Sequence, residues 1–403
     1  MKSELRDILI IGAGAAGLAC ALSALDGGKK PNITLIDRMP KAGKKILVTG
    51  NGRCNLSNTN ISEKCYHGSV NVRSLLSDIP DIRPFFSALG LFTRADGEGR
   101  IYPLSGAASS VNDALRFGIM GKNIELITEC ECQKISYSGD IFTVKTGLGE
   151  IRSKTLVLAC GGSSAAVQGS NGSGFSLAKS MGLALNEPYP ALCALTAEEV
   201  KGLEGVRAPC RADLRFKGKT VKTEFGEVQF TKSGLSGICI FNLSACFKSG
   251  DYAVNLDLAP TFSHKELKQM LASAVTTRGH LEAGDCFGGI FNRPLCLYLL
   301  KRIGIPASKP VKKLTGSDID ILAETSKRLC FKITGRSGFA SSQVTAGGVK
   351  GAEIDGSFMS KKVKGLFLCG EILDVWGDCG GYNLHFAFAS GITAGKEAAK
   401  LIL

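Results

Sequence analysis

The 403-residue sequence lacks any stretch that approaches the roughly 20 consecutive apolar residues of a membrane-spanning helix. It also lacks a Cys-x-x-Cys pair, and its 15 cysteines are an odd number, several of them inside apolar runs. This pattern fits neither a disulfide framework nor a metal site, and it favours buried thiols in a reducing compartment. The polar segment before Asp7 leads directly into an apolar run. We therefore expect no signal peptide, no membrane contact and a cytoplasmic location.

Long runs of a single charge are absent as well. The 49 basic and 36 acidic residues leave a net charge of +13, but the lysines form only short clusters such as Lys312-Lys313. Such a surplus would help to attract an anionic ligand or a nucleic acid, yet scattered lysines are typical of a solvated surface. The sequence shows no RRM, KH or zinc-finger pattern. We expect a small-molecule substrate and no nucleic-acid partner, and the sequence leaves the oligomeric state open.

The N-terminal segment contains an apolar strand that runs into the glycine turn Gly12-Ala-Gly-Ala-Ala-Gly17 and then into a helix over about residues 15–25. In this G-x-G-x-x-G pattern Gly12 permits the tight turn, Gly14 leaves the backbone open to a pyrophosphate, and Gly17 allows close helix packing. The free N–H groups and the dipole of the helix favour phosphate at its start. The alternative is a glycine-rich turn that binds nothing.

A second apolar run, residues 32–37, ends in Asp37, which lies 20 residues after Gly17. A carboxylate at this position accepts hydrogen bonds from ribose hydroxyls and repels a 2′-phosphate, so the unit favours FAD or NAD over NADP. Arg38 adjoins this strand end and is included in the predicted site. Strand, turn, helix, strand and acid occur in the order that a dinucleotide-binding βαβ unit requires.

Three later segments are candidates for further cofactor contacts. The backbone donors of residues 50–52, followed by Arg53 and Asn55, predict an anion or flavin-edge site, with an ordinary surface loop as the alternative. Gly161 and Gly162 end an apolar strand, and a plain tight turn explains them as well as cofactor contact does. Near the C-terminus, a buried-strand pattern over 365–370 precedes Glu371, Asp374 and a helix opened by Gly380-Gly-Tyr-Asn383. Backbone N–H groups at that helix start would stabilise the negative charge of a reduced flavin.

The chain resembles the BaiN-like (YhiN-like) bacterial FAD-dependent oxidoreductases, a family that includes aminoacetone oxidase. The resemblance extends over nearly the whole sequence. It rests on residues 10–17, 43–55, 99–103, 226–237, 344–349 and 370–383, of which only the first motif is shared with many other families.

The resemblance implies a non-covalent FAD in a Rossmann-type domain assembled from both chain ends, with a β-rich domain and a small helical domain inserted between them. It implies FAD contacts at Gly12, Ala15, Ala16, Asp37, Lys44, Asn55, Cys132, Gly370, Glu371 and Asn383. We add to the predicted site further residues from these motifs and from the strand ends described above: Gly14, Gly17, Arg38, Arg53, Cys54, Gly161, Asp374, Gly381 and Tyr382. No catalytic residue is assigned.

The chain departs from the family at two positions. His385 replaces a common glutamine, and Cys160 replaces a usual threonine. Neither change affects the predicted FAD binding, but both put in doubt the transfer of a substrate from a relative. We expect His385 to be a packing histidine with satisfied hydrogen bonds rather than a proton shuttle.

The length predicts two or three domains in an α/β protein. We expect an FAD-binding domain over residues 1–188 and 335–403, an inserted β-rich substrate domain over 189–260 and 308–334, built as a barrel or sandwich, and a helical subdomain over 261–307. Residues 226–237 are glycine-rich enough to approach a flavin, although a hairpin turn explains them nearly as well. Residues 124–127 and 142–145 have the alternation of a meander.

Three kinds of function remain open. The first is an FAD-dependent oxidoreductase that exchanges a hydride at flavin N5. Within this class we favour a reductase fed by NAD(P)H, with an amine oxidase that releases peroxide as the alternative. NAD(P)H would bind only transiently, since no second G-x-G-x-x-G follows a strand. The second is an RNA-binding flavoprotein, and the third is a redox-sensing FAD binder, which the lack of a Cys-x-x-Cys pair does not favour.

Overall fold

The computed structural model describes residues 4–26 and 30–402. The chain divides into two compact units, unit 1 with residues 1–190 and 339–403 and unit 2 with residues 191–338. Both ends of the chain therefore contribute to unit 1, and unit 2 is an insertion. Among the described residues, no helix has the length and apolar character needed to cross a membrane.

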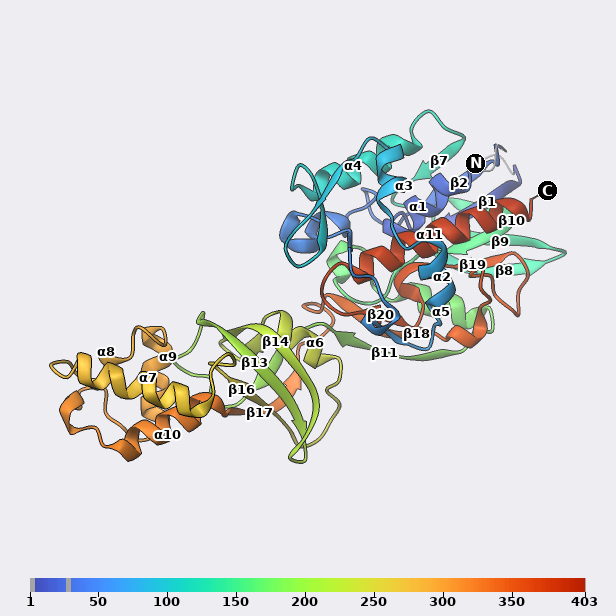
Figure 1. The fold of residues 1–403 in the computed structure, drawn as a ribbon. Coiled ribbons are helices and arrows are strands. Elements are labelled where there is room, and N and C mark those ends of the chain that lie inside the picture. The colour runs from blue at the N-terminus through green and yellow to red at the C-terminus, as the bar shows by residue number, and fades with distance from the viewer. Residues whose placement is uncertain (1–3, 27–29, 403) are drawn as a thin grey trace. The chain divides into compact units, whose positions relative to one another are not determined.

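Unit 1 is built on a parallel sheet with the order β7, β2, β1, β10, β19 (Figure 1). Its strands are apolar on both sides because both faces are covered, as in β1, where residues 8–11 are buried. This arrangement confirms the expected Rossmann-type α/β fold. The bounds of the five strands are Arg6–Ile11 (β1), Ile33–Ile36 (β2), Ile124–Ile127 (β7), Gly149–Leu158 (β10) and Leu366–Leu368 (β19).

Strand β10 changes its partner along one edge. Its first half pairs with β9 (Ile141–Thr146) in antiparallel fashion, and its second half pairs with β19 in parallel. A meander of β8 (Cys132–Ser138), β9 and β10 extends from this point. The prediction that residues 124–127 belong to the meander is wrong, since this segment is β7 and pairs in parallel with β2. A run of only four mostly apolar residues fits either environment, so the sequence pattern alone could not decide between them.

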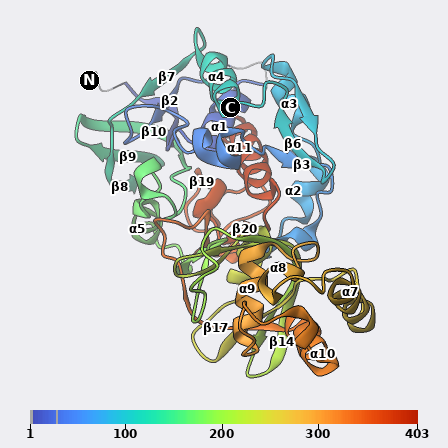
Figure 2. The same cartoon turned by 90° about the vertical axis from the view of Figure 1, so that its left-hand side faces the viewer.

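Helices α1 (Ala15–Ser23) and α11 (Tyr382–Lys400) lie side by side against the sheet, as Figures 1 and 2 both show. The small residues of α11 permit this contact. A Cβ added at Gly391 would lie 2.3 Å from the Ala16 carbonyl oxygen, and one at Gly395 would lie 2.2 Å from that of Cys20. Helix α11 is rich in glycine and alanine because its backbone touches the backbone of α1.

Shorter elements complete unit 1. Their bounds are Ile46–Gly52 (η1), Ser57–Asn58 (β3), Glu63–Cys65 (η2), Tyr66–Gly68 (β4), Arg73–Asp78 (α2), Arg83–Ala88 (α3), Thr93–Ala95 (β5), Arg100–Pro103 (β6), Ala108–Ile119 (α4), Ala166–Gln168 (η3), Ser173–Ser180 (α5), Leu185–Ala191 (β11), Val344–Val349 (β18), Gly351–Glu353 (η5), Gly370–Ile372 (η6) and Val375–Gly377 (β20).

Unit 2 contains a closed barrel with the strand order β12, β15, β14, β13, β16, β17. Alternate residues of β13 face its interior, as the buried Ala208, Cys210, Ala212 and Leu214 show. The glycine-rich segment 226–237 forms the end of β14, a hairpin and β15, and a Cβ at Gly234 would lie 2.0 Å from the Leu195 carbonyl oxygen. Strand bounds are Leu195–Ala197 (β12), Arg207–Phe216 (β13), Lys219–Thr231 (β14), Gly234–Ser236 (β15), Tyr252–Asp257 (β16) and Leu329–Arg336 (β17).

The helices of unit 2 share one hydrophobic core with the barrel. Helix α7 begins with a capping box between Ser263 and Glu266, and Asn292 caps α9. The stretch 308–334, expected to be β-rich, contains α10 before it reaches β17, because Thr315 and Asp318 form a second capping box ahead of a helical apolar pattern. Helix bounds are Ile238–Ser244 (α6), His264–Thr277 (α7), Ala283–Cys286 (α8), Arg293–Arg302 (α9), Val311–Lys313 (η4) and Gly316–Lys327 (α10).

Candidate functional site

The glycine turn between β1 and α1 has three glycines with different physical roles. Gly12 has φ +108°, and a Cβ there would lie 2.4 Å from the Ala159 carbonyl oxygen. A Cβ at Gly17 would lie 1.8 Å from the Gly12 carbonyl oxygen. A Cβ at Gly14, in contrast, would meet no atom within 4 Å. The fold therefore requires Gly12 and Gly17, whereas Gly14 faces open space in which a pyrophosphate could reach the backbone.

The start of α1 also has the properties of an anion site. Gly14 is the N-cap and provides no side-chain hydrogen bond to the first turn, in which no acidic residue lies. The N–H groups of Ala15 and Ala16 thus point out of the helix end toward the space beside Gly14, where they and the helix dipole favour a phosphate.

Asp37 follows β2 and lies directly behind this turn. One carboxylate oxygen accepts a hydrogen bond of 2.7 Å from the Ala13 N–H, and the other accepts one of 2.7 Å from the Met39 N–H. Burial raises the pKa of Asp37, and the two backbone N–H groups oppose that shift. The next residue, Arg38, has a buried Nη1 with no hydrogen-bond partner among the described residues. A ligand with ribose and adenine groups would supply partners to both side chains.

The loop that contains Arg53, Cys54 and Asn55 turns sharply through left-handed backbone conformations, with Cys54 at φ 57°. Burial raises the pKa of the Cys54 thiol to about 12, so this cysteine is an inert packing residue. Asn55 Oδ1 is buried and has no partner among the described residues. Arg53 is exposed and lies 4.8 Å from the centre of the Tyr102 ring.

This loop meets the start of α11. A Cβ at Gly381, which has φ +102°, would lie 2.3 Å from the Ser57 carbonyl oxygen and 2.7 Å from Asn55 Oδ1. The predicted contacts Asn55 and Gly381 are therefore close together although more than 300 residues separate them. The orphaned amide oxygen lies where a second helix N-terminus opens, which is suited to a polar heterocycle with both hydrogen-bond donors and acceptors.

Gly370 and Glu371 connect the C-terminal strand end to the N-terminal segments. A Cβ at Gly370 would lie 2.9 Å from the Ala16 Cβ, and the Gly370 N–H donates to Ser390 Oγ at 3.0 Å. Glu371 accepts from the Thr345 N–H at 2.6 Å and from Lys45 Nζ at 2.6 Å. The structure thus brings the two predicted halves of the site together.

Lys45, rather than Lys44, makes this ion pair, and sequence analysis missed it. Lys44 Nζ donates to the Val167 carbonyl oxygen at 2.9 Å from an exposed position. The two lysines are adjacent in sequence, and only the tertiary fold shows which one reaches Glu371. The FAD contact predicted for Lys44 stays a prediction.

The Gly161-Gly162 pair follows β10 and packs tightly. Gly161 has φ +71°, and a Cβ there would lie 2.9 Å from Ser170 Oγ. A Cβ at Gly162 would lie 2.4 Å from Thr345 Oγ1 and 3.2 Å from Glu371 Oε1. These contacts are sufficient to explain both glycines as a tight turn, and cofactor contact at Gly161 stays a prediction.

Asp374 and Asn383 have side chains that bind protein groups. Asp374 is buried and accepts from the Ser69 N–H at 3.1 Å and from Asn186 Nδ2 at 2.6 Å. Asn383 accepts from the Gly377 N–H and donates to the Gly377 carbonyl oxygen, both at 2.8 Å. Their side chains therefore fix the backbone around the site. What Asn383 and Tyr382 offer a ligand is the backbone N–H groups of the first turn of α11.

The cysteines of the candidate site are unreactive by their surroundings. All 15 cysteines are free, and 10 of them are buried, which confirms the expected buried thiols. Burial raises the pKa of Cys132 to about 12 and also raises that of Cys160, whose thiol contacts the Ile11 carbonyl oxygen at 3.5 Å. Cys132 is therefore a neutral packing group at neutral pH.

His385 is a packing histidine, as expected. It is fully buried, its Nδ1 lies 2.8 Å from Ser57 Oγ, and its Nε2 lies 3.1 Å from the Ile79 carbonyl oxygen. The carbonyl can only accept, so Nε2 carries the proton and Nδ1 accepts from the hydroxyl. Burial lowers the pKa of His385 to about 4, which keeps the ring neutral.

A cluster of His67, Trp376 and Asp378 beside the start of α11 was not predicted from the sequence. His67 on β4 stacks on Trp376 with ring centres 4.2 Å apart, and its Nε2 lies 3.0 Å from Asp378 Oδ1. The pairing of β4 with β20 creates this contact between residues more than 300 positions apart. No short-range signal in the sequence could have revealed it.

The residues present fit a dinucleotide that carries a flavin. The open space at Gly14 suits the pyrophosphate, and the two orphaned buried atoms, Arg38 Nη1 and Asn55 Oδ1, lack partners that such a ligand would supply. The helix starts of α1 and α11 provide two sets of backbone donors. Among the described residues there is no group of three or more side chains that could hold a metal ion.

A Rossmann sheet with such a turn, closed by a C-terminal strand and helix, defines the class of dinucleotide-binding oxidoreductases. Residues 6–397 match the family model described as the HI0933-like protein Rossmann domain, and the chain belongs to this family. The resemblance to BaiN-like flavoproteins is thereby confirmed. The chain is a flavin-dependent oxidoreductase.

Curated relatives match along almost the full chain. The chain is 32% identical to the 3-dehydro-bile acid delta(4,6)-reductase of Clostridium scindens, with 97% of this chain and 98% of the relative covered. It is 28% identical to the ribosomal RNA dihydrouridine synthase of Escherichia coli, with 97% of each covered. A solved quinol-fumarate reductase with menaquinol molecules shares the fold, with a TM-score of 0.51 and 16% identity over 99% of this chain and 72% of that one.

Proposed function

We propose that this protein is an FAD-dependent reductase that saturates a carbon–carbon double bond conjugated to a carbonyl group in a small organic molecule, with NAD(P)H as the transient hydride donor. The observation that carries the proposal is the full-length match to the bile-acid reductase. The dihydrouridine synthase points to the same chemistry, since dihydrouridine is uridine with two hydrogens added across a double bond next to a carbonyl.

Bound FAD would exchange a hydride at its N5 atom, and the chain would position and stabilise the reacting groups. Asp37 would hold the ribose, while the backbone at Gly14 would receive the pyrophosphate. The first-turn N–H groups of α11, which has Gly381 as an N-cap without a side-chain hydrogen bond, would stabilise negative charge on the ring. Asn383 holds the Gly377 peptide on both sides and so fixes the loop that precedes these donors.

The reduction requires a two-electron donor, and we propose NAD(P)H for this role. Saturation of a double bond consumes two electrons and two protons, and the flavin must be reduced again in each cycle. The chain has no second G-x-G-x-x-G motif after a strand, so nicotinamide would bind, transfer its hydride and leave before the substrate binds.

Turnover assays under nitrogen and in air separate the reductase from the oxidase. We expect oxidation of NADH or NADPH under nitrogen only when a 4-en-3-one or 4,6-dien-3-one steroid is present, with formation of the saturated product. A simple cyclic enone tests whether the steroid skeleton is needed. Peroxide release from aminoacetone in air, without any enone reduction under nitrogen, would refute the reductase and support the amine oxidase.

A second candidate is reduction of uridine in RNA. Unit 2 contains 22 basic and 14 acidic residues, so it carries most of the net positive charge. Arg207, Arg211 and Arg215 lie at every fourth position of β13 on the side away from the barrel interior, and the 68% exposed Phe225 lies opposite Arg211. Against RNA binding, Glu227 and Asp213 already pair with the first two arginines.

Binding to a ribosomal RNA fragment tests this second candidate. Tight binding that weakens steeply with salt, together with dihydrouridine in the RNA after incubation with NADPH, would support it. Weak binding without dihydrouridine would leave the small-molecule reductase as the function.

A further inference from the structure

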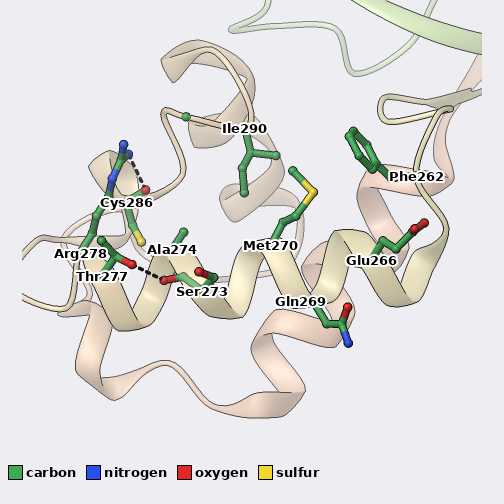
Figure 3. Close-up of a pocket in the computed structure, with 11 residues that line it drawn as sticks. Phe262, Glu266, Gln269, Met270, Ser273, Ala274, Thr277, Arg278, Cys286 and Ile290 are labelled. Carbon is green, nitrogen blue, oxygen red and sulfur yellow. Dashed lines mark hydrogen bonds between the residues drawn. The ribbon is translucent and has the colours of Figure 1, made fainter.

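Helix α7 of unit 2 has one face that the core does not use. The helix packs Leu267 and Leu271 into the core, while its other side lines a cavity of about 640 Å³ together with α8 and the turn after it (Figure 3). The large apolar side chains that line this groove are those of Phe262, Met270 and Ile290. Phe262 and Met270 are 41% and 36% exposed, so they are available to a ligand.

Arg278 lies at one end of the groove, where α7 ends (Figure 3). Its Nη1 donates to the Cys286 carbonyl oxygen at 2.9 Å, which fixes the guanidinium. Within the described part of the chain, no carboxylate forms an ion pair with Arg278. The nearby Asp285 pairs with Arg293 instead, at 2.8 Å. A positioned cation thus borders an apolar groove without a counter-charge.

The turn beside this guanidinium consists of Gly288 and Gly289, and neither has φ in the left-handed region. A Cβ at Gly289 would lie 3.4 Å from Arg278 Nη2, an ordinary contact, and one at Gly288 would meet nothing closer than 3.9 Å. The backbone therefore does not require glycine at these positions. Because Gly288 and Gly289 have no side chains, the guanidinium of Arg278 stays uncovered.

We propose that this groove binds an amphipathic monocarboxylate, a small molecule with an extended apolar body and one terminal carboxylate. The carboxylate pairs with the fork of Arg278, and the apolar body covers Ile290, Met270 and Phe262. The volume lies in the range of small-molecule sites. Glu266 lines the far end, about 18 Å away at the helical rise per residue, so a second carboxylate there would be repelled.

This site consists entirely of unit 2 residues and does not rest on the proposed reaction. Its ligand could regulate the enzyme or be held for delivery, and either role begins with the same binding step. Binding is therefore the property to test, on the full chain with its flavin.

Calorimetric titration with dodecanoate, below its micelle concentration, tests the proposal. We expect saturable binding, at least tenfold weaker binding of dodecanol, and weaker binding of dodecanedioate because of Glu266. Arg278→Gln should weaken dodecanoate binding at least tenfold, and Arg278→Lys should restore part of it. Gly289→Asp should abolish dodecanoate binding, because it places the protein's own carboxylate beside the guanidinium. The matched control Gly288→Ala should bind dodecanoate like the wild type.

The methyl NMR signal of Met270, assigned through Met270→Leu, locates the ligand independently. We expect it to shift on addition of dodecanoate, and thermal melting checks that each variant is folded. Equal affinity for dodecanoate and dodecanol, or unchanged affinity in folded Arg278→Gln protein, would overturn the proposal in favour of non-specific apolar association. Binding that leaves the Met270 signal unmoved would overturn it as well.

Discussion

Alanine substitutions at Gly14 and Gly17 separate the part of the glycine turn that serves the ligand from the part that serves the fold. In Gly14→Ala the new Cβ meets no protein atom within 4 Å, so the flavin-free protein should lose at most about 1 kcal/mol, the cost of alanine in place of glycine at an N-cap. The methyl group would, however, lie where the pyrophosphate approaches the backbone. Loss of one hydrogen bond to a charged group costs about 1.5–3 kcal/mol. That loss corresponds to FAD binding about 10- to 150-fold weaker.

Gly17→Ala should behave in the opposite way. Its Cβ would lie 1.8 Å from the Gly12 carbonyl oxygen, so α1 must move away from β1 even without flavin. We expect a loss of about 1–3 kcal/mol or more in the stability of the flavin-free protein. Thermal melting of the flavin-free variants and quenching of FAD fluorescence give the two quantities. If Gly14→Ala binds FAD as tightly as the wild type, or if both variants lose the same stability, the assignment of Gly14 to the pyrophosphate is refuted.

Three further predictions concern the same unit. Asp37→Asn should weaken FAD binding about tenfold or more by loss of a charged acceptor. Because burial raises the pKa of Asp37, the FAD affinity of the wild type should fall on acidification at a higher pH than for an ordinary carboxyl group. Titrations of the variant should lack this pH dependence. The pKa of His385 is about 4 in the folded state and 6.5 in the unfolded state. The neutral ring therefore contributes about 3 kcal/mol to the stability of the folded protein above pH 6.5, and this stability is lost as the pH falls from 6.5 through 4. Denaturant titrations across that range should show a flatter profile for His385→Gln, and an identical profile would contradict the buried neutral ring. The Lys45–Glu371 pair is partly exposed, and a double-mutant cycle of Lys45→Met and Glu371→Gln should give a coupling of about 0.2–1 kcal/mol; zero coupling would remove its role in joining the two chain ends.

The parts of the fold that short-range patterns determine were predictable. The βαβ unit follows from an apolar strand, three glycines at fixed spacing and a terminal acid, and each of these has a local physical cause. Family resemblance extended this prediction to a Rossmann domain built from both chain ends. Only the structure, in contrast, shows that Gly391 and Gly395 of α11 touch the backbone of α1.

Other features depend on tertiary contacts that no local pattern encodes. Residues 124–127 have a sequence pattern that suits a meander strand, yet they extend the parallel sheet beside β2. Asp374 and Asn383 resemble ligand contacts in the sequence, but their side chains bind Asn186 and Gly377, which lie in other segments. Likewise, the choice between Lys44 and Lys45 as the partner of Glu371 depends on how η1 meets η6.

We infer that both ends of the chain together hold one FAD molecule. Calorimetric titration of the flavin-free protein with FAD tests it most directly. We expect one FAD per chain, recovery of the yellow absorbance, and at least tenfold weaker binding when Gly14→Ala is introduced. A protein that stays colourless and releases no heat on addition of FAD would contradict it.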